Sequence, residues 1–377
     1  MKITRLELIH VKPRWLFLRV HTDEGLVGYG EPIVEGRALT VESAIRELES
    51  YLIGADPLRI EHHWQAMYRG AFYRGGPVLV SAISGIEQAL WDIKGKFYNM
   101  PVYEMLGGAC RHKIRMYAHC HGDTVEASVR TALERKQQGF TAIKIGLEAP
   151  VQIVDNLAYL ERQVERLASI RKAVGSEMDI AIDFHGRVSP AMAIRLAAAF
   201  EPYYPMFIEE PCLPENVDQM VKISQSTTIP IATGERLFTK WGFRELIEKK
   251  AVSIVQPDLC HAGGILESKK IAAMAESHYG AVAPHNPLGP ISLAACLQLD
   301  TCTPNFIIQE HPTIHDRSDL GVGFLKKPFQ IVDGYIQVPE GPGLGIELDE
   351  EALQERVYEG NWDTPRLYHE DGSVADW

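Results

Sequence analysis

The first residues of the chain alternate between apolar and polar side chains. Residues 2–10 and 15–22 both follow this period of two, which is typical of half-buried strands. The tetrapeptide at 22–25, Thr-Asp-Glu-Gly, has the composition of a hairpin turn. We therefore predict two strands, followed by a third that runs to Gly30.

Helical spacing replaces the alternation after residue 40. Apolar side chains recur every three or four residues from Val41 to Leu52, Thr40 is suited to be the N-cap, and Gly54 ends the pattern. A second predicted helix carries a set of apolar residues on one face, namely Ile83, Ile86, Leu90 and Ile93. Strands followed by helices, without alternation of the two, predict an α+β unit.

A different pattern begins at about residue 112. Eight β-rich runs follow one another, separated by amphipathic helical segments: 114–120, 141–146, 178–184, 206–211, 229–235, 252–258, 281–286 and 305–310. This alternation over about 200 residues predicts a (β/α)₈-type, TIM-like barrel. An open, doubly wound sheet is the alternative, but the G-x-G-x-x-G motif expected after its first strand is absent.

These patterns divide the chain into three parts. We predict an N-terminal α+β domain over residues 1–112 and a catalytic barrel over 113–325. Residues 326–377 return to hairpin-like patterning, and we expect this C-terminal segment to rejoin the N-terminal domain.

Charge and composition narrow the classes of partner. The 38 basic and 50 acidic residues give a net charge of −12, which opposes binding to nucleic acid or to an anionic membrane. No stretch reaches the ~20 apolar residues of a membrane helix, and the charged first residues do not resemble a signal peptide. The six cysteines form no C-x-x-C pair, which indicates reduced thiols. We expect a cytoplasmic enzyme with a small-molecule partner, and homo-oligomers are possible.

Ionisable residues end six consecutive β-rich runs. They are Asp183, Glu209, Glu235, Asp258, His285 and Glu310. Their spacing of about 25 residues is one strand–helix unit, and the C-terminal ends of barrel strands meet at one mouth. The sequence therefore predicts that these six side chains lie together at an active site.

Three of these acids come from adjacent strands. Asp183, Glu209 and Glu235 would repel one another unless a cation lay between them, and hard oxygen ligands suit Mg²⁺. Glu210 should point to the other side of its strand, so we assign the ligand role to Glu209. The alternative is a set of solvated loop acids, although each one directly follows an apolar run.

Two histidines at the predicted mouth are candidates for proton transfer. Strand alternation places His185 on the same face as Asp183, whereas His285 comes from the opposite side of the barrel. Asp258 is positioned to accept a hydrogen bond from His285, which would set its tautomer and raise its basicity. Three further histidines are possible substrate contacts: His119, His121 and His261.

Several motifs, in order along the chain, carry a family resemblance. In the first part they are PRWLFL (13–18), TDEG (22–25), GEP (30–32), FYRGGP (72–77) and QALWDIKGK (88–96). In the barrel they are DFHGRVS (183–189), FIEEP (207–211), GERLF (234–238), QPDLCHAGGI (256–265) and APHNPLGPI (283–291). Over essentially its whole length, the chain resembles the mandelate racemase subgroup of the enolase superfamily, and within it the acid-sugar dehydratases.

The resemblance implies an α+β capping domain, formed by both chain ends, over a modified (β/α)₇β barrel. It implies that Asp183, Glu209 and Glu235 are Mg²⁺ ligands and that His285, paired with Asp258, is the general base. It also implies that His185 is the general acid and that Glu310 is the carboxyl group that helps to hold the enolate. The implied reaction is removal of the C2 proton and the 3-hydroxyl of an acid sugar, with D-galactonate as the expected substrate. We expect Arg14, Tyr73 and Lys144 to contact that substrate.

Other functions remain open at this point. The same constellation would serve a dehydratase for gluconate, arabinonate or galactarate. Racemases of the subgroup resemble K-x-K at the second strand, and here Gly146 follows Lys144-Ile145, so the second lysine base is missing. A non-catalytic barrel is disfavoured because all the predicted metal and acid–base side chains are present.

Overall fold

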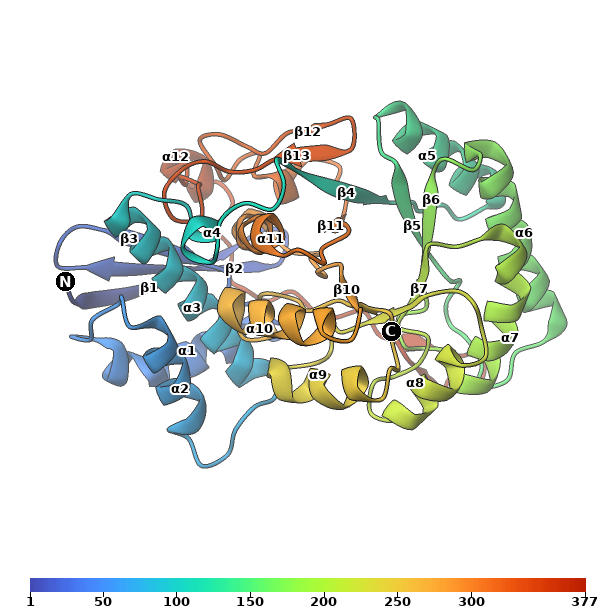
Figure 1. Ribbon diagram of the computed structural model, residues 1–377, viewed down its shortest axis with the longest axis horizontal. Coiled ribbons are helices and arrows are strands. Elements are labelled where there is room, and N and C mark those ends of the chain that lie inside the picture. The colour runs from blue at the N-terminus through green and yellow to red at the C-terminus, as the bar shows by residue number, and fades with distance from the viewer.

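The computed structural model describes residues 1–377, and it contains two packed units (Figure 1). One is a capping domain built on an antiparallel sheet of three strands: β1 (Ile3–Val11), β2 (Trp15–Thr22) and β3 (Val27–Gly30). His21 of β2 lies opposite Val27 of β3, so the hairpin predicted at 22–25 is confirmed.

Four helices complete the capping domain: α1 (Ala38–Leu52), α2 (Ile60–Arg69), α3 (Pro77–Tyr98) and α4 (Val102–Met105). The prediction that Thr40 caps α1 is wrong. The backbone N–H of Thr40 already donates to the carbonyl of Arg37, so Thr40 lies inside the first turn and Arg37 is the N-cap. The predicted apolar face is correct, since Val41 and Leu52 are both fully buried.

Helix α3 is buried on almost all sides because it lies between the capping sheet and the barrel. The sequence predicted only one apolar face for it. Its backbone approaches β3 so closely that a Cβ atom at Gly30 would lie 1.9 Å from the carbonyl oxygen of Gly85. Only glycine therefore fits at this position of β3.

We expect Gly30→Ala to lower the free energy of unfolding by about 1–3 kcal/mol, because two backbone segments must separate. Chemical denaturation measures this change. The matched control is Gly242→Ala within α9 (Thr239–Glu248), where the new methyl group meets nothing closer than 3.7 Å. The control should be unchanged or more stable by up to ~1 kcal/mol. Equal stability of the two variants would contradict the close-packing argument.

The second unit is a closed barrel of parallel strands: β4 (Lys113–His119), β5 (Ala142–Gly146), β6 (Asp179–Asp183), β7 (Phe207–Glu209), β8 (Ile231–Thr233), β9 (Ile254–Val255), β10 (Ala281–Val282) and β11 (Gln309–His311). Neighbours along the chain pair in parallel from β4 to β10, and β11 pairs with β4. A bridge between Val282 and Phe306 closes the ring, which excludes the open-sheet alternative.

Seven helices connect these strands: α5 (Val125–Gln137), α6 (Leu157–Val174), α7 (Pro190–Phe200), α8 (Val217–Ser224), α9, α10 (Gly264–Glu276) and α11 (Pro290–Cys302). Short 3₁₀ turns follow α7 and β11, at η1 (Glu201–Tyr203) and η2 (Ser318–Leu320). The last strand is thus followed by no barrel helix. The predicted (β/α)₇β barrel with a capping domain is confirmed.

Eight apolar side chains fill the centre of the barrel, and each one lies on a barrel strand or next to its end. They are Tyr117, Ala142, Ala181, Phe207, Ala232, Ile254, Ala283 and Ile308. Because small and large residues share the space, the interior is a packed core. Chemistry is therefore confined to the strand ends, where polar side chains replace the apolar ones.

Two buried glutamates hold the capping domain on the barrel. Glu31 accepts hydrogen bonds from the N–H groups of Gly289 and Ser292 at the start of α11, at 2.7 and 2.9 Å. Glu87 on α3 accepts two similar bonds, at 2.7 and 2.9 Å, from the first turn of α10. Burial raises the pKa of Glu31 to about 8 and that of Glu87 to about 7. Each carboxyl group, from a residue of the capping domain, thus accepts hydrogen bonds from the free N–H groups at the start of a barrel helix.

The segment 326–377 is divided between the two units. It contains β12 (Ile331–Val332), β13 (Tyr335–Gln337), α12 (Glu350–Gln354), β14 (Leu367–Tyr368) and β15 (Val374–Ala375). Strand β13 pairs with β4 of the barrel, whereas Gly343 and Tyr358 hydrogen bond to capping-domain backbone. The last strands, β14 and β15, pair with each other in a hairpin. The structure has no helix long and apolar enough to cross a membrane.

Candidate active site

A cavity of about 640 Å³ lies at the C-terminal ends of the barrel strands, under the capping domain. Seven of the predicted site residues line it: Arg14, Lys144, Asp183, His185, Glu235, His285 and Glu310. Glu209 and Asp258 adjoin it through hydrogen bonds to Lys144 and His285. The strand-end rule therefore brings together side chains from most of the barrel, as the sequence predicted.

The acids meet around one ammonium group. Asp183 and Glu209 are in register on β6 and β7, which places their carboxylates side by side. The Nζ atom of Lys144, on β5, lies 2.8 Å from Glu209 Oε1, 2.8 Å from Glu310 Oε1 and 3.4 Å from Asp183 Oδ2. The other oxygen of Glu209 accepts a hydrogen bond of 2.8 Å from Gln256.

Negative charge exceeds positive charge at this point. Burial raises the pKa of Glu209 to about 8, and the carboxylates of Asp183, Glu310 and Glu235 add to that effect against the opposing influence of Lys144. A buried carboxyl group in this state gains from any additional cation. The oxygen-only donor set is of the kind that Mg²⁺ prefers.

No three His, Cys, Asp or Glu side chains converge closely enough in this arrangement to enclose a metal ion. Lys144 occupies the space between Asp183 and Glu209. Glu235 instead lies 3.6 Å from His285 Nε2 and 3.9 Å from Arg236 Nε. The donor chemistry thus fits a divalent cation, and the side chains of Lys144 and Glu235 would have to reorient to admit one.

His285 and Asp258 form a hydrogen-bonded pair in which Asp258 is fully buried and His285 partly so. Nδ1 of His285 lies 2.7 Å from Asp258 Oδ2, and Asp258 Oδ1 accepts a hydrogen bond of 2.7 Å from the N–H of Cys260. Burial lowers the pKa of His285, but the carboxylates of Glu235, Glu310 and Asp258 outweigh that effect and raise it well above its usual value. This contact leaves Nε2 of His285, on the pocket side, as the nitrogen available for proton transfer.

His185 lies across the mouth from His285, because β6 and β10 are the third and seventh of eight strands. It reaches the pocket by a different route from the one predicted. Strand β6 ends at Asp183, so strand alternation does not extend to His185, whose backbone is left-handed at φ 55°. Its N–H donates to Asp183 Oδ1 at 2.7 Å, and Arg187 donates to its Nδ1. A tight turn therefore presents His185.

Glu310 is held by three donors. Oε1 accepts from His119 Nε2 at 2.7 Å and from Lys144, and Oε2 accepts from the N–H of Asn286 at 2.7 Å. Although burial raises its pKa, Lys144, His285 and His119 together lower it well below the usual value. Glu310 is consequently a carboxylate that orients hydrogen-bond donors at the pocket wall.

Two family descriptions match the chain: "Mandelate racemase / muconate lactonizing enzyme, N-terminal domain" over residues 9–107 and "Enolase C-terminal domain-like" over residues 127–352. The chain belongs to the mandelate racemase subgroup of the enolase superfamily. It is 48% identical to D-galactonate dehydratase of Ralstonia pickettii and 47% identical to D-galactonate dehydratase of Cronobacter sakazakii, in both cases over 100% of each chain. These relatives identify this enolase-superfamily chain as a carbon–oxygen lyase, similar to galactonate dehydratase.

Solved structures agree with this membership. A member of the enolase superfamily from Salmonella Typhimurium is 34% identical, with a TM-score of 0.89 over 94% of this chain and 98% of that one. A mandelate racemase/muconate lactonizing enzyme from Sulfitobacter sp. is 33% identical, with a TM-score of 0.89 over 98% and 100% of the two chains.

The remaining predicted contacts of this enolase-superfamily chain divide into two groups. Arg14 and Lys144 line the pocket, and so do His119 and His261. Tyr73 and His121 do not. The side chain of Tyr73 is 83% exposed, because the loop before α3 points it into solvent.

Among the pocket residues to which the sequence assigned no role are Arg236, Phe238 and Trp377. Arg236 directly follows the predicted ligand Glu235, so its position was a usable signal. Arg236 Nε lies 2.9 Å from Glu210 Oε2. Glu210 follows the end of β7 with a left-handed backbone at φ 42°, so the strand alternation from which its direction was predicted does not extend to it. Glu35 belongs to the capping-domain loop 34–36, and it lies 3.7 Å from both Arg14 and His261.

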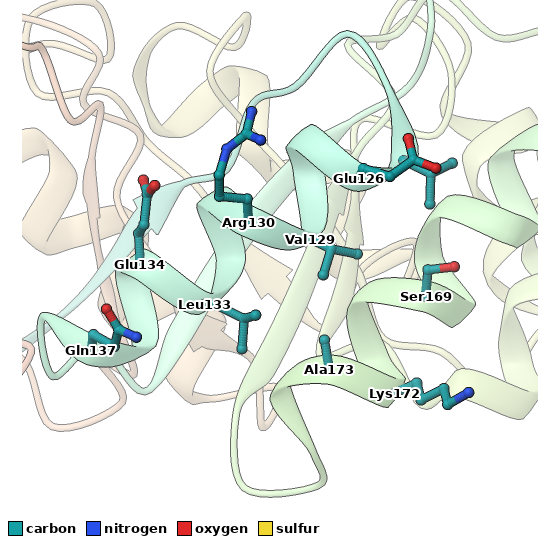
Figure 2. A pocket seen from close by; sticks show the side chains of 10 residues that line it. Glu126, Val129, Arg130, Leu133, Glu134, Gln137, Ser169, Lys172 and Ala173 are labelled. Atoms are coloured by element: carbon teal, nitrogen blue, oxygen red, sulfur yellow. The ribbon is translucent and has the colours of Figure 1, made fainter.

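A second cavity, of about 750 Å³, lies on the outer surface of this enolase-superfamily barrel. Figure 2 shows that α5 and α6 form it, with Val129, Leu133 and Ala173 at its base. It contains no histidine, cysteine or paired acid–base groups. The cavity at the barrel mouth is therefore the candidate active site.

Proposed function

We propose that the protein is a Mg²⁺-dependent acid-sugar dehydratase that converts D-galactonate to 2-dehydro-3-deoxy-D-galactonate and water, in carbohydrate catabolism. One observation carries the proposal. The His285–Asp258 pair faces His185 across a pocket rich in carboxylates, in a chain that matches D-galactonate dehydratases over its full length. Dehydration needs a base that removes the C2 proton and an acid that protonates the departing 3-hydroxyl.

Asp183, Glu209 and Glu235 are the residues that would hold Mg²⁺. When bound, the ion would supply positive charge to the substrate carboxylate as the neighbouring carbon loses its proton. The support from this structure is the chemistry of the donor set and the raised pKa of Glu209. The donor set and the raised pKa of Glu209 both indicate that an additional cation would stabilise these acids more than Lys144 does alone.

Two histidines of the chain carry out the proton transfers of the proposed reaction. In its neutral form, His285 accepts the C2 proton on Nε2, while Asp258 accepts a hydrogen bond from Nδ1–H and stabilises the imidazolium that forms. His185 then donates a proton to the departing 3-hydroxyl, which leaves as water. The resulting enol tautomerises to the 2-keto-3-deoxy acid.

Lys144 has a larger role in this proposal than substrate contact alone. Both carboxyl oxygens of Glu310 accept hydrogen bonds from the protein, Oε1 from Lys144 and His119 and Oε2 from the N–H of Asn286. Lys144 and His119, which Glu310 orients at 2.8 and 2.7 Å, are the donors available on that side of the pocket. We therefore assign Glu310 a positioning role and Lys144 the direct electrostatic one.

The test of the proposal is an acid-sugar library incubated with Mg²⁺ and read out as 2-keto-3-deoxy products. We expect D-galactonate to have the highest kcat/KM, on the strength of the full-length relatives. The library includes gluconate, arabinonate and the diacid galactarate. A kcat/KM for any of these that exceeds the galactonate value by roughly tenfold, about 1.4 kcal/mol, would reassign the substrate while leaving the dehydratase chemistry intact.

Racemisation is the rival reaction within the same superfamily. Position 146, at the end of β5, is a glycine that lies opposite Asp183 and carries no side chain to act as a second base. The library distinguishes the two reactions, because a racemase would invert C2 without forming a keto acid.

A further inference from the structure

The hairpin of β14 and β15 lies over the barrel mouth and not over the capping domain. It faces the loops that follow β6 and β7, and a cavity of about 460 Å³ lies between them. His369 and Asp376 line the hairpin side of that cavity, and Arg187 and Cys212 line the barrel side. Figure 1 shows the C-terminus in the same region, near β7 and α8 and away from the N-terminus.

Trp377 follows this hairpin and enters the active-site pocket. Its indole lines the same cavity as His185, and the two ring centroids are 6.4 Å apart with 59° between the planes. The preceding residue, Asp376, lies near enough to Arg187 to favour its charged form, and Arg187 donates to Nδ1 of His185. Two consecutive residues thus flank the proposed acid, one directly and one through Arg187.

The exposure of Trp377 indicates what it contacts. Ala375, on the same hairpin, is buried at 9% exposure. Trp377, in contrast, is 40% exposed and lines the pocket. The groups next to His185 are mostly charged, with Asp183 and Arg236 among them, so the indole gives this end of the pocket a broad apolar surface.

We propose that Trp377 is a specificity-determining residue that forms the pocket wall beside His185 and packs against the C–H face of a polyhydroxylated monoacid. This inference rests on the proposed function. A hydroxyl-rich chain has an apolar C–H face that suits an aromatic ring, while its hydroxyl groups need the charged side chains opposite. The wall also limits the access of bulk water to His185, at the end of the substrate from which the hydroxyl leaves.

The test compares Trp377→Ala, Trp377→Phe and a control on the same hairpin, Tyr368→Ala, whose side chain is exposed. With D-galactonate and Mg²⁺, we expect Trp377→Ala to lower kcat/KM by roughly 10–100-fold, the usual effect of altering an apolar pocket wall. Trp377→Phe should stay within about threefold of wild type, and Tyr368→Ala should be unchanged. Thermal melting of each variant reports whether the hairpin and barrel remain folded.

A second measurement distinguishes a pocket wall at Trp377 from a role of Trp377 in supporting the fold of the whole site. An analogue of the substrate without the 3-hydroxyl group can exchange its C2 proton with solvent deuterium but cannot eliminate water. Because Trp377 borders His185, Trp377→Ala should exchange this proton at close to the wild-type rate when the analogue is saturating, although dehydration is slow.

Each outcome decides the matter. Wild-type dehydration by Trp377→Ala overturns the inference. An equal loss of exchange and dehydration in Trp377→Ala, with substrate and analogue both saturating, also overturns it, since that pattern describes structural support. Failure of the wild-type protein to dehydrate any acid sugar overturns the proposed function, and with it the inference. That result is visible before any variant is made, so the two failures are distinguishable.

Discussion

Replacing His285 by asparagine is expected to stop both dehydration and exchange of the C2 proton with solvent. Asparagine keeps a polar group near Asp258 but has no nitrogen that accepts a proton at neutral pH. The loss in kcat should be at least roughly 10²–10⁴-fold, or about 3–5 kcal/mol in the barrier. Product formation and deuterium uptake by mass spectrometry measure the two steps. The matched control, His278→Asn, changes an exposed histidine near β10 and should have no effect.

His185→Asn should behave differently, because His185 lies on the opposite side of the mouth. Dehydration should slow by roughly 10²–10⁴-fold, the usual contribution of a general acid. The 3-deoxy analogue should still exchange its C2 proton, since that step uses His285 alone. Exchange lost in His185→Asn but kept in His285→Asn would reverse the two roles. Loss of exchange in both variants would show that position in the barrel does not separate acid from base.

Chelation of divalent metal, or the substitution Glu209→Gln, is expected to abolish turnover while the fold persists. Glu209 is 1% exposed and lies near the carboxylates of Asp183, Glu310 and Glu235. A bound cation would stabilise its charged form against burial and against this repulsion. Mg²⁺ should restore the activity of the chelated wild-type protein but not that of Glu209→Gln. Full activity in excess EDTA would exclude the metal site.

Metal binding also has a readout that does not depend on catalysis. An ion that binds only the folded state stabilises it by about 2.7 kcal/mol at a hundredfold excess over Kd, and thermal melting with and without Mg²⁺ detects this shift. The wild-type protein should gain stability and Glu209→Gln should gain little. Glu248→Gln is the control, because Glu248 is an exposed acid at the end of α9. Equal Mg²⁺-dependent shifts in all three proteins would place the ion elsewhere.

Much of the site could be predicted from strand position alone. Asp183, Glu209 and Glu235 each end or directly follow an apolar run, and parallel strands in a closed barrel must bring those ends to one mouth. The contact between Asp258 and His285 followed from the same rule applied to adjacent strands, and the structure places these atoms 2.7 Å apart. Regular geometry carries such information because the period of a strand–helix unit is nearly constant.

The sequence was less reliable in predicting where a helix begins or a strand ends. Thr40 has the chemistry of an N-cap, yet α1 starts two residues earlier because the preceding backbone already satisfies the helical hydrogen bonds. His185 was expected on a strand and lies in a left-handed turn beyond it. In both cases the composition was informative, but the exact end of an element depends on hydrogen bonds that the pattern does not specify.

The sequence by itself determined the barrel, its capping domain and the set of acids and histidines at the strand ends, because these follow from local periodicity repeated along the chain. Only the tertiary structure decided which side chains reach the pocket from loops. Trp377 enters from a hairpin far along the chain, Glu35 from a capping loop, and Tyr73 points to solvent. Such positions depend on how separate segments pack against each other, and no period in the sequence records that packing.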